Sequence, residues 1–216
     1  MNFLKPMMDK VGIINIGIGS LISLKNCLNK INIETEYCYK PDDLFNYNNI
    51  ILPGVGNFGN ASDLLFLRNW NQSISDFLKE RNRKLMGICL GFQILFEESE
   101  ESNNSPGLAL MKGKISHLKT SHSFRIPHVG WNNINILKKD SFLSFIKDPI
   151  DVYFVHSYAL AVNRILDLEQ FDEYTITEHG ENKFISSFRS GNIYGCQFHP
   201  EKSSKVGMKF FKSFFD

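Results

Sequence analysis

Short, nearly continuous apolar runs alternate with amphipathic stretches through the first half of the chain. We predict four strands and two helices here, with the strands at residues 11–16, 33–39, 49–52 and 84–88 and the helices at 21–31 and 61–80. An uninterrupted apolar run is typical of a strand that is covered on both faces, and alternation with helices favours parallel pairing. The pattern therefore predicts an α/β fold with a mostly parallel central sheet and helices on both faces.

The second half of the chain reads differently. Strands separated by short polar turns predict a smaller antiparallel portion at residues 129–137, 151–155, 174–178, 183–188 and 192–197, and a helix is expected at 205–215. No linker divides the 216 residues, so we expect a single domain over 1–216 that includes a short N-terminal extension at 1–10. The polar run at 97–106 is expected to be a solvated surface connection without chemistry.

Composition excludes several classes of function. The chain has 24 lysines and arginines against 23 aspartates and glutamates, which argues against binding nucleic acid or anionic membranes by bulk charge. No apolar run approaches the roughly 20 residues of a membrane-spanning helix, and no signal-peptide pattern is present, so a cytoplasmic protein is expected. The four scattered cysteines lack metal spacing, so we expect buried reduced thiols and no metal site.

The sharpest local motif is Gly-Ile-Cys-Leu-Gly at residues 87–91, directly after a predicted strand and before an expected apolar helix. This is the layout of a nucleophile elbow, with Cys89 in the nucleophile position. A following helix would favour the reactive thiolate through its dipole. The backbone N–H of Leu90 would face a developing oxyanion.

A base for this nucleophile follows the last predicted strand. His199 stands at that strand end, where sheet enzymes place their sites, and Glu201 comes two residues later across a proline. A carboxylate beside the imidazole would orient it and stabilise its protonated form. The sequence thus predicts Cys89 as nucleophile, His199 as general acid and base, and Glu201 as the orienting group.

The loop Leu-Pro-Gly-Val-Gly-Asn-Phe-Gly at residues 52–59 follows another buried strand. Glycines on both sides of Val55 allow the backbone to approach a ligand and expose its N–H groups. The loop lacks the Lys-Ser/Thr ending of a P-loop and the register of a dinucleotide motif, so no nucleotide cofactor is expected. We predict Val55 as the second oxyanion donor, opposite Leu90.

Together these motifs resemble the class I glutamine amidotransferases. Pro-His-Val-Gly-Trp-Asn at 127–132 and Tyr-Phe-Val-His-Ser-Tyr at 153–158 narrow the resemblance to the glutaminase subunits of imidazole glycerol phosphate synthases. The resemblance implies a flavodoxin-like architecture and hydrolysis of glutamine to glutamate and ammonia through a cysteine thioester. It also implies a heterodimer with a (β/α)8-barrel cyclase subunit, which receives the ammonia in histidine biosynthesis.

The resemblance assigns further residues. Those matching glutamine-binding positions are Gly54, Gly56, Gln93, Ser157 and Tyr158. Those matching positions at the partner interface are Ser20, Trp131, Asn132 and Lys202. The chain departs from many relatives at residues 15–20, where it reads Asn-Ile-Gly-Ile-Gly-Ser in place of Asp-Tyr-Gly-x-Gly-Asn. That departure falls on the partner side and bears on the identity of the partner.

Other functions stay open at this point. The same glutaminase could supply ammonia for amidination of a surface-glycan sugar, with a cyclase-like partner and a sugar amidotransferase. A stress sensor with a cysteine elbow would not need the His-Pro-Glu motif, and a peptidase or γ-glutamyl hydrolase would not need the segments at 127–132 and 153–158. His156 is either a structural or a functional histidine, whereas His117, His122 and His179 receive no role.

Overall fold

A mixed sheet of nine strands runs through the residues that the computed structural model describes, which are 10–19, 21–120, 124–145, 150–165 and 167–216. One half is parallel, in the order β2 (Thr35–Cys38), β1 (Val11–Ile14), β3 (Asn49–Gly54), β4 (Lys84–Cys89) and β12 (Ile193–Cys196). The other half is antiparallel, in the order β11 (Asn182–Ser190), β10 (Glu173–His179), β7 (His128–Lys138) and β8 (Ile150–His156). The two portions predicted from sequence therefore share one sheet.

The junction between the two halves is β12. It pairs parallel with β4 on one side and antiparallel with β11 on the other. The last strand of the chain thus returns to the centre of the sheet, beside the strand that carries the predicted nucleophile. The sequence places this strand in the antiparallel portion, and the structure shows that it belongs to both portions.

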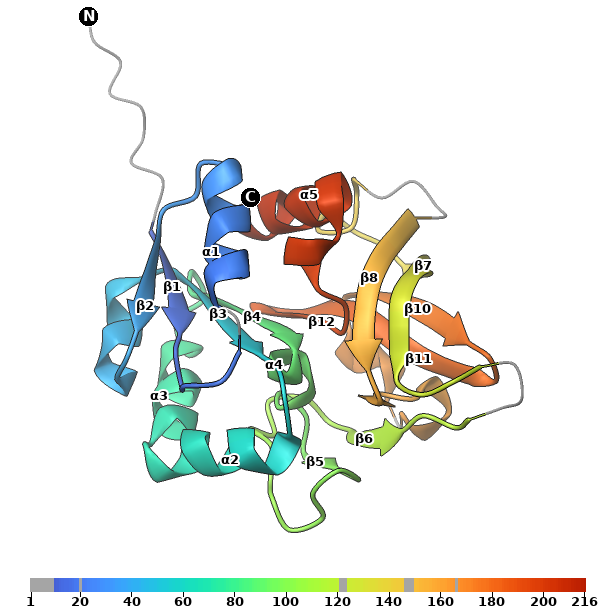
Figure 1. Cartoon of the computed structure of the whole chain (residues 1–216). Coiled ribbons are helices and arrows are strands. Elements are labelled where there is room, and N and C mark those ends of the chain that lie inside the picture. Colours follow the sequence, from blue (N-terminus) through green and yellow to red (C-terminus); the bar gives the residue numbers. More distant parts are fainter. Residues whose placement is uncertain (1–9, 20, 121–123, 146–149, 166) are drawn as a thin grey trace, which may run out of the picture.

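Helices cover both faces of the parallel half (Figure 1). On one face lie α1 (Leu21–Lys30) and α5 (Ser204–Phe215), and on the other lie α2 (Phe58–Leu67), α3 (Trp70–Phe77) and α4 (Leu90–Gln93). In β3, Ile51 packs with the first group of helices, whereas Ile50 and Leu52 pack with the second. Successive side chains of one strand are therefore buried on opposite faces, which explains its unbroken apolar sequence.

Two helices differ from the prediction. The expected helix over 61–80 is divided into α2 and α3, because Asn69 between them adopts a left-handed conformation with a φ of 58°. The side chain of Asn57 caps α2 by accepting a hydrogen bond from the N–H of Asn60 at 3.1 Å. The helix expected after the elbow is the single turn α4, so its dipole is far smaller than that of a long helix.

Short elements that the sequence did not predict complete the fold. A small second sheet contains β5 (Glu98–Ser99), β6 (Lys114–His117) and β9 (Tyr158–Ala159). Four 3-10 helices are present in the described residues, namely η1 (Pro41–Asn46), η2 (Val162–Arg164), η3 (Leu168–Gln170) and η4 (Pro200–Lys202). No helix in the described part of the chain is both long and apolar enough to cross a membrane.

The acidic segment at 97–106 is more than a surface connection. Besides forming β5, it supplies a carboxylate and a hydroxyl to the start of α2. Glu101 Oε2 accepts a hydrogen bond from the N–H of Phe58 at 2.8 Å, and Ser102 Oγ accepts one from the N–H of Gly59 at 3.1 Å. The first N–H groups of a helix have no partner within it, so this segment anchors the helix that follows the Pro-Gly-Val-Gly loop.

Candidate active site

Cys89 occupies a strained backbone position at the end of β4. Its φ of 54° and ψ of −105° are unfavourable for a residue with a Cβ atom, and the residue is buried, with a relative exposure of 6%. The flanking glycines, Gly87 and Gly91, are required because neighbouring backbone atoms approach them closely. A Cβ on Gly91 would lie 1.7 Å from Leu52 O, and one on Gly87 would lie 2.5 Å from Gly91 O. The sharp turn predicted from the motif is therefore confirmed.

The Pro-Gly-Val-Gly loop lies directly beside this elbow. Parallel pairing of β3 with β4 sets Gly54 opposite Cys89 in register. A Cβ on Gly54 would lie 3.1 Å from the Cβ of Leu90, so the two backbones approach closely. Val55 follows and is 45% exposed, and Gly56 adopts a φ of 112° that favours glycine.

The predicted base reaches the elbow through the next strand in the sheet. The β12–β4 register sets Cys196 opposite Ile88, so His199, three residues beyond Cys196, follows β12 at the same edge as Cys89. The His199 Nδ1–H donates to Glu201 Oε1 at 2.8 Å, and both side chains are buried. Among the described residues, His199 Nε2 has no hydrogen-bond partner, which leaves it available for chemistry.

The charges at this site favour a protonated imidazole. Burial acts most strongly on the pKa of His199 and lowers it, but the interactions of His199 with Cys89 and Glu201 together outweigh burial and raise that pKa above its ordinary value. An imidazolium beside the sulfur stabilises the thiolate.

The other three cysteines are free and buried, as predicted. Burial raises the pKa of the Cys38 thiol to about 12, and it also raises the pKa values of Cys27 and Cys196. These three thiols are held in their unreactive protonated form, so none of them is expected to act as a nucleophile. No group of three His, Cys, Asp or Glu side chains in the described ranges is arranged to hold a metal ion.

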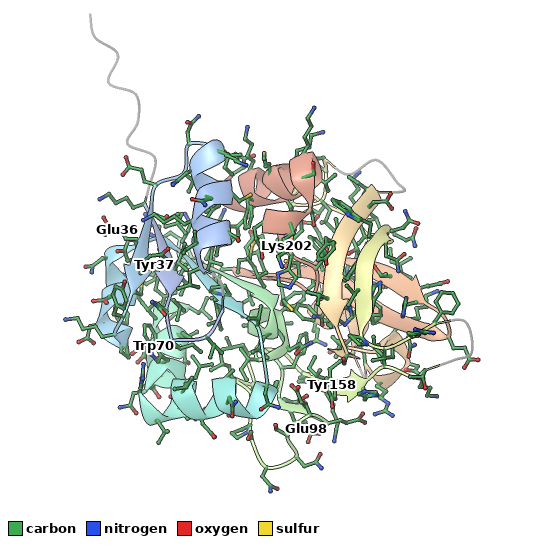
Figure 2. All side chains as sticks on the ribbon, viewed as in Figure 1. Glu36, Tyr37, Trp70, Glu98, Tyr158 and Lys202 are labelled. Carbon is green, nitrogen blue, oxygen red and sulfur yellow. The ribbon has the colours of Figure 1, made fainter. Side chains whose placement is uncertain are left out.

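A cavity of about 390 Å³ opens beside the Cys89 thiol. Its lining gathers most of the residues predicted from sequence, namely Val55, Gly56, Cys89, Leu90, Gln93, Ser157, Tyr158 and Lys202. Gly54, His199 and Glu201 line a smaller cavity of about 30 Å³, which shares Val55 and Lys202 with the first. In Figure 2, Lys202 lies on the α5 side of the molecule and Tyr158 lies toward β5 and β6.

The residues predicted at a partner interface fall into three groups. Trp131 is 55% exposed and packs edge-on against the Tyr153 ring at 6.1 Å, and Lys202 Nζ lies 5.7 Å from the centre of the same ring. These side chains form an aromatic and cationic row that connects β7 to the rim of the cavity. Asn132 instead turns toward His128, with Nδ2 at 3.2 Å from His128 Nε2. Ser20 lies outside the described residues.

Comparisons with known proteins point to one family over nearly the whole chain. The family described as glutamine amidotransferase class-I matches residues 13–216. The chain belongs to this family. It is 40% identical over 210 residues to imidazole glycerol phosphate synthase subunit HisH of Pyrococcus furiosus, covering 96% of this chain and 98% of the relative. It is 37% identical over 204 residues to the subunit of the same name from Caldanaerobacter subterraneus subsp. tengcongensis, covering 94% and 96%.

Three further comparisons extend this result. In Arabidopsis thaliana, the chloroplastic imidazole glycerol phosphate synthase hisHF is 35% identical over 94% of this chain, which covers 33% of that longer protein. Among solved structures, a glutamine amidotransferase matches with a TM-score of 0.71 at 17% identity, covering 94% of this chain and 96% of that one. PurLQS from Thermotoga maritima also matches with a TM-score of 0.71, at 20% identity, covering 96% and 98%. The structural likeness establishes the class I amidotransferase fold.

Sequence reasoning missed several residues of this amidotransferase site. Glu101 and Val155 line the main cavity, and Gln197 Nε2 lies 3.9 Å from the Cys89 sulfur. Gln197 lies two residues before His199 in a motif that had been noted, so its position was a usable signal. Glu101 belongs to the segment to which we had assigned no chemistry, and nothing in its local sequence indicates that it reaches the cavity.

Proposed function

We propose that this protein is the glutaminase subunit of an imidazole glycerol phosphate synthase and that Cys89, His199 and Glu201 carry its chemistry. The subunit name comes from relatives that match nearly the whole chain at 35–40% identity. The observation that carries the chemical proposal is the strained Cys89 in a cavity-lining elbow, with the buried His199–Glu201 pair acting on it. We also propose that residues 1–216 act as one domain in the cytoplasm.

The first half-reaction forms a thioester. The Cys89 thiolate attacks the side-chain amide carbon of glutamine, and the carbonyl π electrons move to oxygen. The N–H groups of Leu90 and Val55 would stabilise this oxyanion, a role supported by the adjacent β3 and β4 ends. When the C–N bond breaks, the His199 Nε2–H protonates the leaving nitrogen and ammonia departs, while Glu201 holds the opposite ring nitrogen.

The second half-reaction restores the enzyme. His199 is now neutral, and its Nε2 accepts a proton from water as the water oxygen attacks the thioester carbon. The C–S bond then breaks, the new γ-carboxyl group loses its proton to solvent as glutamate is released, and the Cys89 thiolate is again paired with a protonated imidazole. Burial of the His199–Glu201 pair supports this cycle. Exclusion of bulk water strengthens the attraction of the protonated imidazole to the Glu201 carboxylate and to the Cys89 thiolate.

The remaining residues would bind the substrate and the partner. The residues proposed to hold the glutamine backbone groups are Gly54, Gly56, Gln93, Ser157 and Tyr158. Each lines one of the two cavities, which share Val55 and Lys202. A (β/α)8-barrel cyclase is proposed to receive ammonia as the partner in a heterodimer. The exposed row of Trp131 and Lys202 beside the cavity supports a docking face there.

The alternatives have less support. A glycan-sugar acceptor was motivated by the departure at Ser20, which lies outside the described residues, and no observation on the described residues favours it. A sensor would need the thiolate alone, whereas this protein also has a hydrogen-bonded His199–Glu201 pair. A peptidase would have no use for the Trp131 row, and the curated relatives carry a synthase name.

Covalent labelling tests the assignment of the nucleophile. We expect 6-diazo-5-oxo-L-norleucine, an electrophilic glutamine analogue, to modify Cys89 alone, and mass spectrometry of the digested protein identifies the labelled peptide. Excess glutamine should slow the labelling. Modification of Cys27, Cys38 or Cys196 instead, or no protection by glutamine, would overturn the proposed site.

A further inference from the structure

A chain of hydrogen bonds begins at Asn132 on β7 and runs inward. Asn132 Nδ2 lies 3.2 Å from His128 Nε2, and His128 Nδ1 lies 3.1 Å from His156 Nε2. His156 Nδ1 then lies 2.9 Å from the carbonyl oxygen of Tyr158. Both histidines are buried, with relative exposures of 3% and 6%. These hydrogen bonds therefore run from β7 across to β8 and reach the wall of the active-site cavity.

The same carbonyl oxygen continues the chain toward the nucleophile. Gln93 Nε2 donates to Tyr158 O at 2.8 Å and to Gln197 Oε1 at 3.1 Å. Gln197 Nε2 in turn lies 3.9 Å from the Cys89 sulfur. Gln93 and Gln197 are buried, at 5% and 0% exposure. Tyr158 O is thus the point at which the histidine pair meets the side chains around Cys89.

The direction of every bond around the histidines follows from chemistry. A carbonyl oxygen can only accept, so His156 Nδ1 carries a proton and donates to Tyr158 O. For a neutral ring, His156 Nε2 must then accept from His128 Nδ1–H, which leaves His128 Nε2 to accept from Asn132. Burial, with smaller contributions from neighbouring histidines, lowers the pKa of His156 to about 3 and that of His128 to about 4. Both rings are therefore neutral near pH 7.

Gln93 is oriented by the same logic. Both hydrogens of its Nε2 are committed to oxygen acceptors, so the carbonyl Oε1 is the atom of this amide that is available to a ligand. Gln93 lines the cavity beside Cys89, where an acceptor suits an ammonium group or the N–H groups of an amide. His156 contributes to this arrangement because it holds the carbonyl to which Gln93 is bound.

We propose that His156 is a positioning residue for glutamine binding, whose Nδ1–H fixes the Tyr158 carbonyl and, through it, the Gln93 side chain. The inference rests on the proposed glutaminase function. His156 also lines the cavity, but both of its ring nitrogens are bound within the protein, so it has no free nitrogen for proton transfer to a substrate. It acts through Tyr158 and Gln93.

Three variants of His156 separate the two ring nitrogens. An asparagine amide nitrogen can occupy the place of Nδ1, a glutamine amide nitrogen reaches the place of Nε2, and leucine supplies neither. The assay is glutamate release by the full chain with the cyclase subunit present, with kcat and KM determined for glutamine. Losing one hydrogen bond to the carbonyl is expected to raise KM about tenfold in His156→Leu, while kcat changes less than about threefold. His156→Asn should restore KM to within about threefold of wild type, and His156→Gln should behave like His156→Leu.

Two controls keep the outcomes distinct. The His179 ring stacks on the His128 ring with their centres 4.1 Å apart, but His179 takes no part in the series of hydrogen bonds from Asn132 to Cys89. His179→Leu should therefore leave KM unchanged. Equal KM values for His156→Asn and His156→Gln, or a wild-type KM for His156→Leu, would overturn the inference. If His156→Leu does not fold, the Asn–Gln comparison decides alone. A wild-type protein that releases no glutamate would instead contradict the proposed function, before any His156 variant is compared.

Discussion

At the scale of single residues, the account depends on unequal roles for His199 and Glu201. His199 is proposed to move a proton in both half-reactions, whereas Glu201 touches only the ring nitrogen that faces away from the chemistry, at 2.8 Å. We therefore expect His199→Ala to lower kcat for glutamine hydrolysis at least about tenfold more than Glu201→Gln does. Steady-state kinetics on both variants measures this difference. Equal losses would leave the division of roles without support.

The pKa of His199 provides a second test at this scale. Because Cys89 and Glu201 are the groups that raise this pKa against the effect of burial, removing the thiolate should lower it. We expect Cys89→Ala to titrate His199 at a lower pH than the wild type, as measured by NMR of histidine-labelled protein. Cys196→Ala is the control, since its buried protonated thiol carries no charge to attract an imidazolium. An unchanged His199 pKa in Cys89→Ala would contradict the ion pair.

The residue types of the site could be predicted from sequence, but several of their contacts could not. Gly87 and Gly91 predict a sharp turn because only glycine tolerates such a close approach of the backbone. The structure confirms this turn. Glu101 lies in a polar run whose local pattern is that of an exposed loop, and only the tertiary fold brings it to the cavity. The resemblance assigns Asn132 to the partner interface, and nothing in its local sequence predicts its contact with His128.

At the scale of elements, one buried carboxylate connects β10 to the segment after β7. Glu173 is fully buried and accepts hydrogen bonds from the N–H groups of Asp140, Phe142 and Leu143 at 2.9, 3.0 and 2.9 Å. Arg189 Nη1 lies 3.4 Å from the same carboxylate. One side chain therefore satisfies three backbone donors, two of which, Phe142 and Leu143, would otherwise be buried without partners.

We expect Glu173→Gln to lower the free energy of unfolding by about 3 kcal/mol, because the amide nitrogen would oppose N–H donors and Arg189 would lose its one fully buried carboxylate partner, keeping only the more exposed Asp140 and Asp172. Urea denaturation followed by circular dichroism measures the change. Glu169→Gln is the matched control, since Glu169 pairs with Lys138 at a side-chain exposure of 90% and should change stability by less than about 0.5 kcal/mol. Similar values for the two variants would contradict the role given to Glu173.

Element types were predicted more reliably than element ends. The strands of the parallel half were recognised because burial on both faces requires unbroken apolar sequence. The break between α2 and α3 was missed because Asn69 adopts a left-handed conformation that asparagine tolerates without interrupting the apolar pattern. The short α4 was overestimated because the apolar residues after it, such as Leu95 and Phe96, are buried in turns rather than in a helix.

At the scale of the whole molecule, the buried histidine pair predicts sensitivity to acid. The folded pKa values of His128 and His156, about 4 and 3, are depressed from the ordinary value of 6.5, so the unfolded chain binds protons first as the pH falls. Each histidine should therefore cost about 2 kcal/mol of stability between pH 7 and pH 5. His199 offsets only a small part of this loss, because the contribution of a raised folded pKa is complete below 6.5 and is already nearly complete at pH 7.

Unfolding by urea at pH 7 and at pH 5 checks this prediction. The double variant His128→Asn, His156→Asn should lose most of the difference between the two pH values, although it is less stable at pH 7. A wild-type protein that is equally stable at both values would contradict the neutral, buried state assigned to the pair.

The exposed row formed by Trp131 on β7 and Lys202 on η4 is the proposed contact with the cyclase subunit. Trp131 is 55% exposed beside the active-site cavity, and we propose that the cyclase subunit covers it. Trp131→Ala should therefore reduce stimulation of glutamine hydrolysis by the cyclase, while activity without the cyclase stays the same. Leu137→Ala, at a similarly exposed position of 53% on the same strand, is the control. A loss of unstimulated activity in Trp131→Ala alone would refute the interface assignment.

Glutamate release from glutamine by the purified chain, with and without the cyclase subunit and its nucleotide substrate, tests the central claim most directly. The account predicts strong stimulation by the cyclase and complete loss of turnover in Cys89→Ala, with the variant still folded and still bound to the cyclase. Turnover well above background in Cys89→Ala would contradict the claim that this cysteine is the nucleophile of a glutaminase.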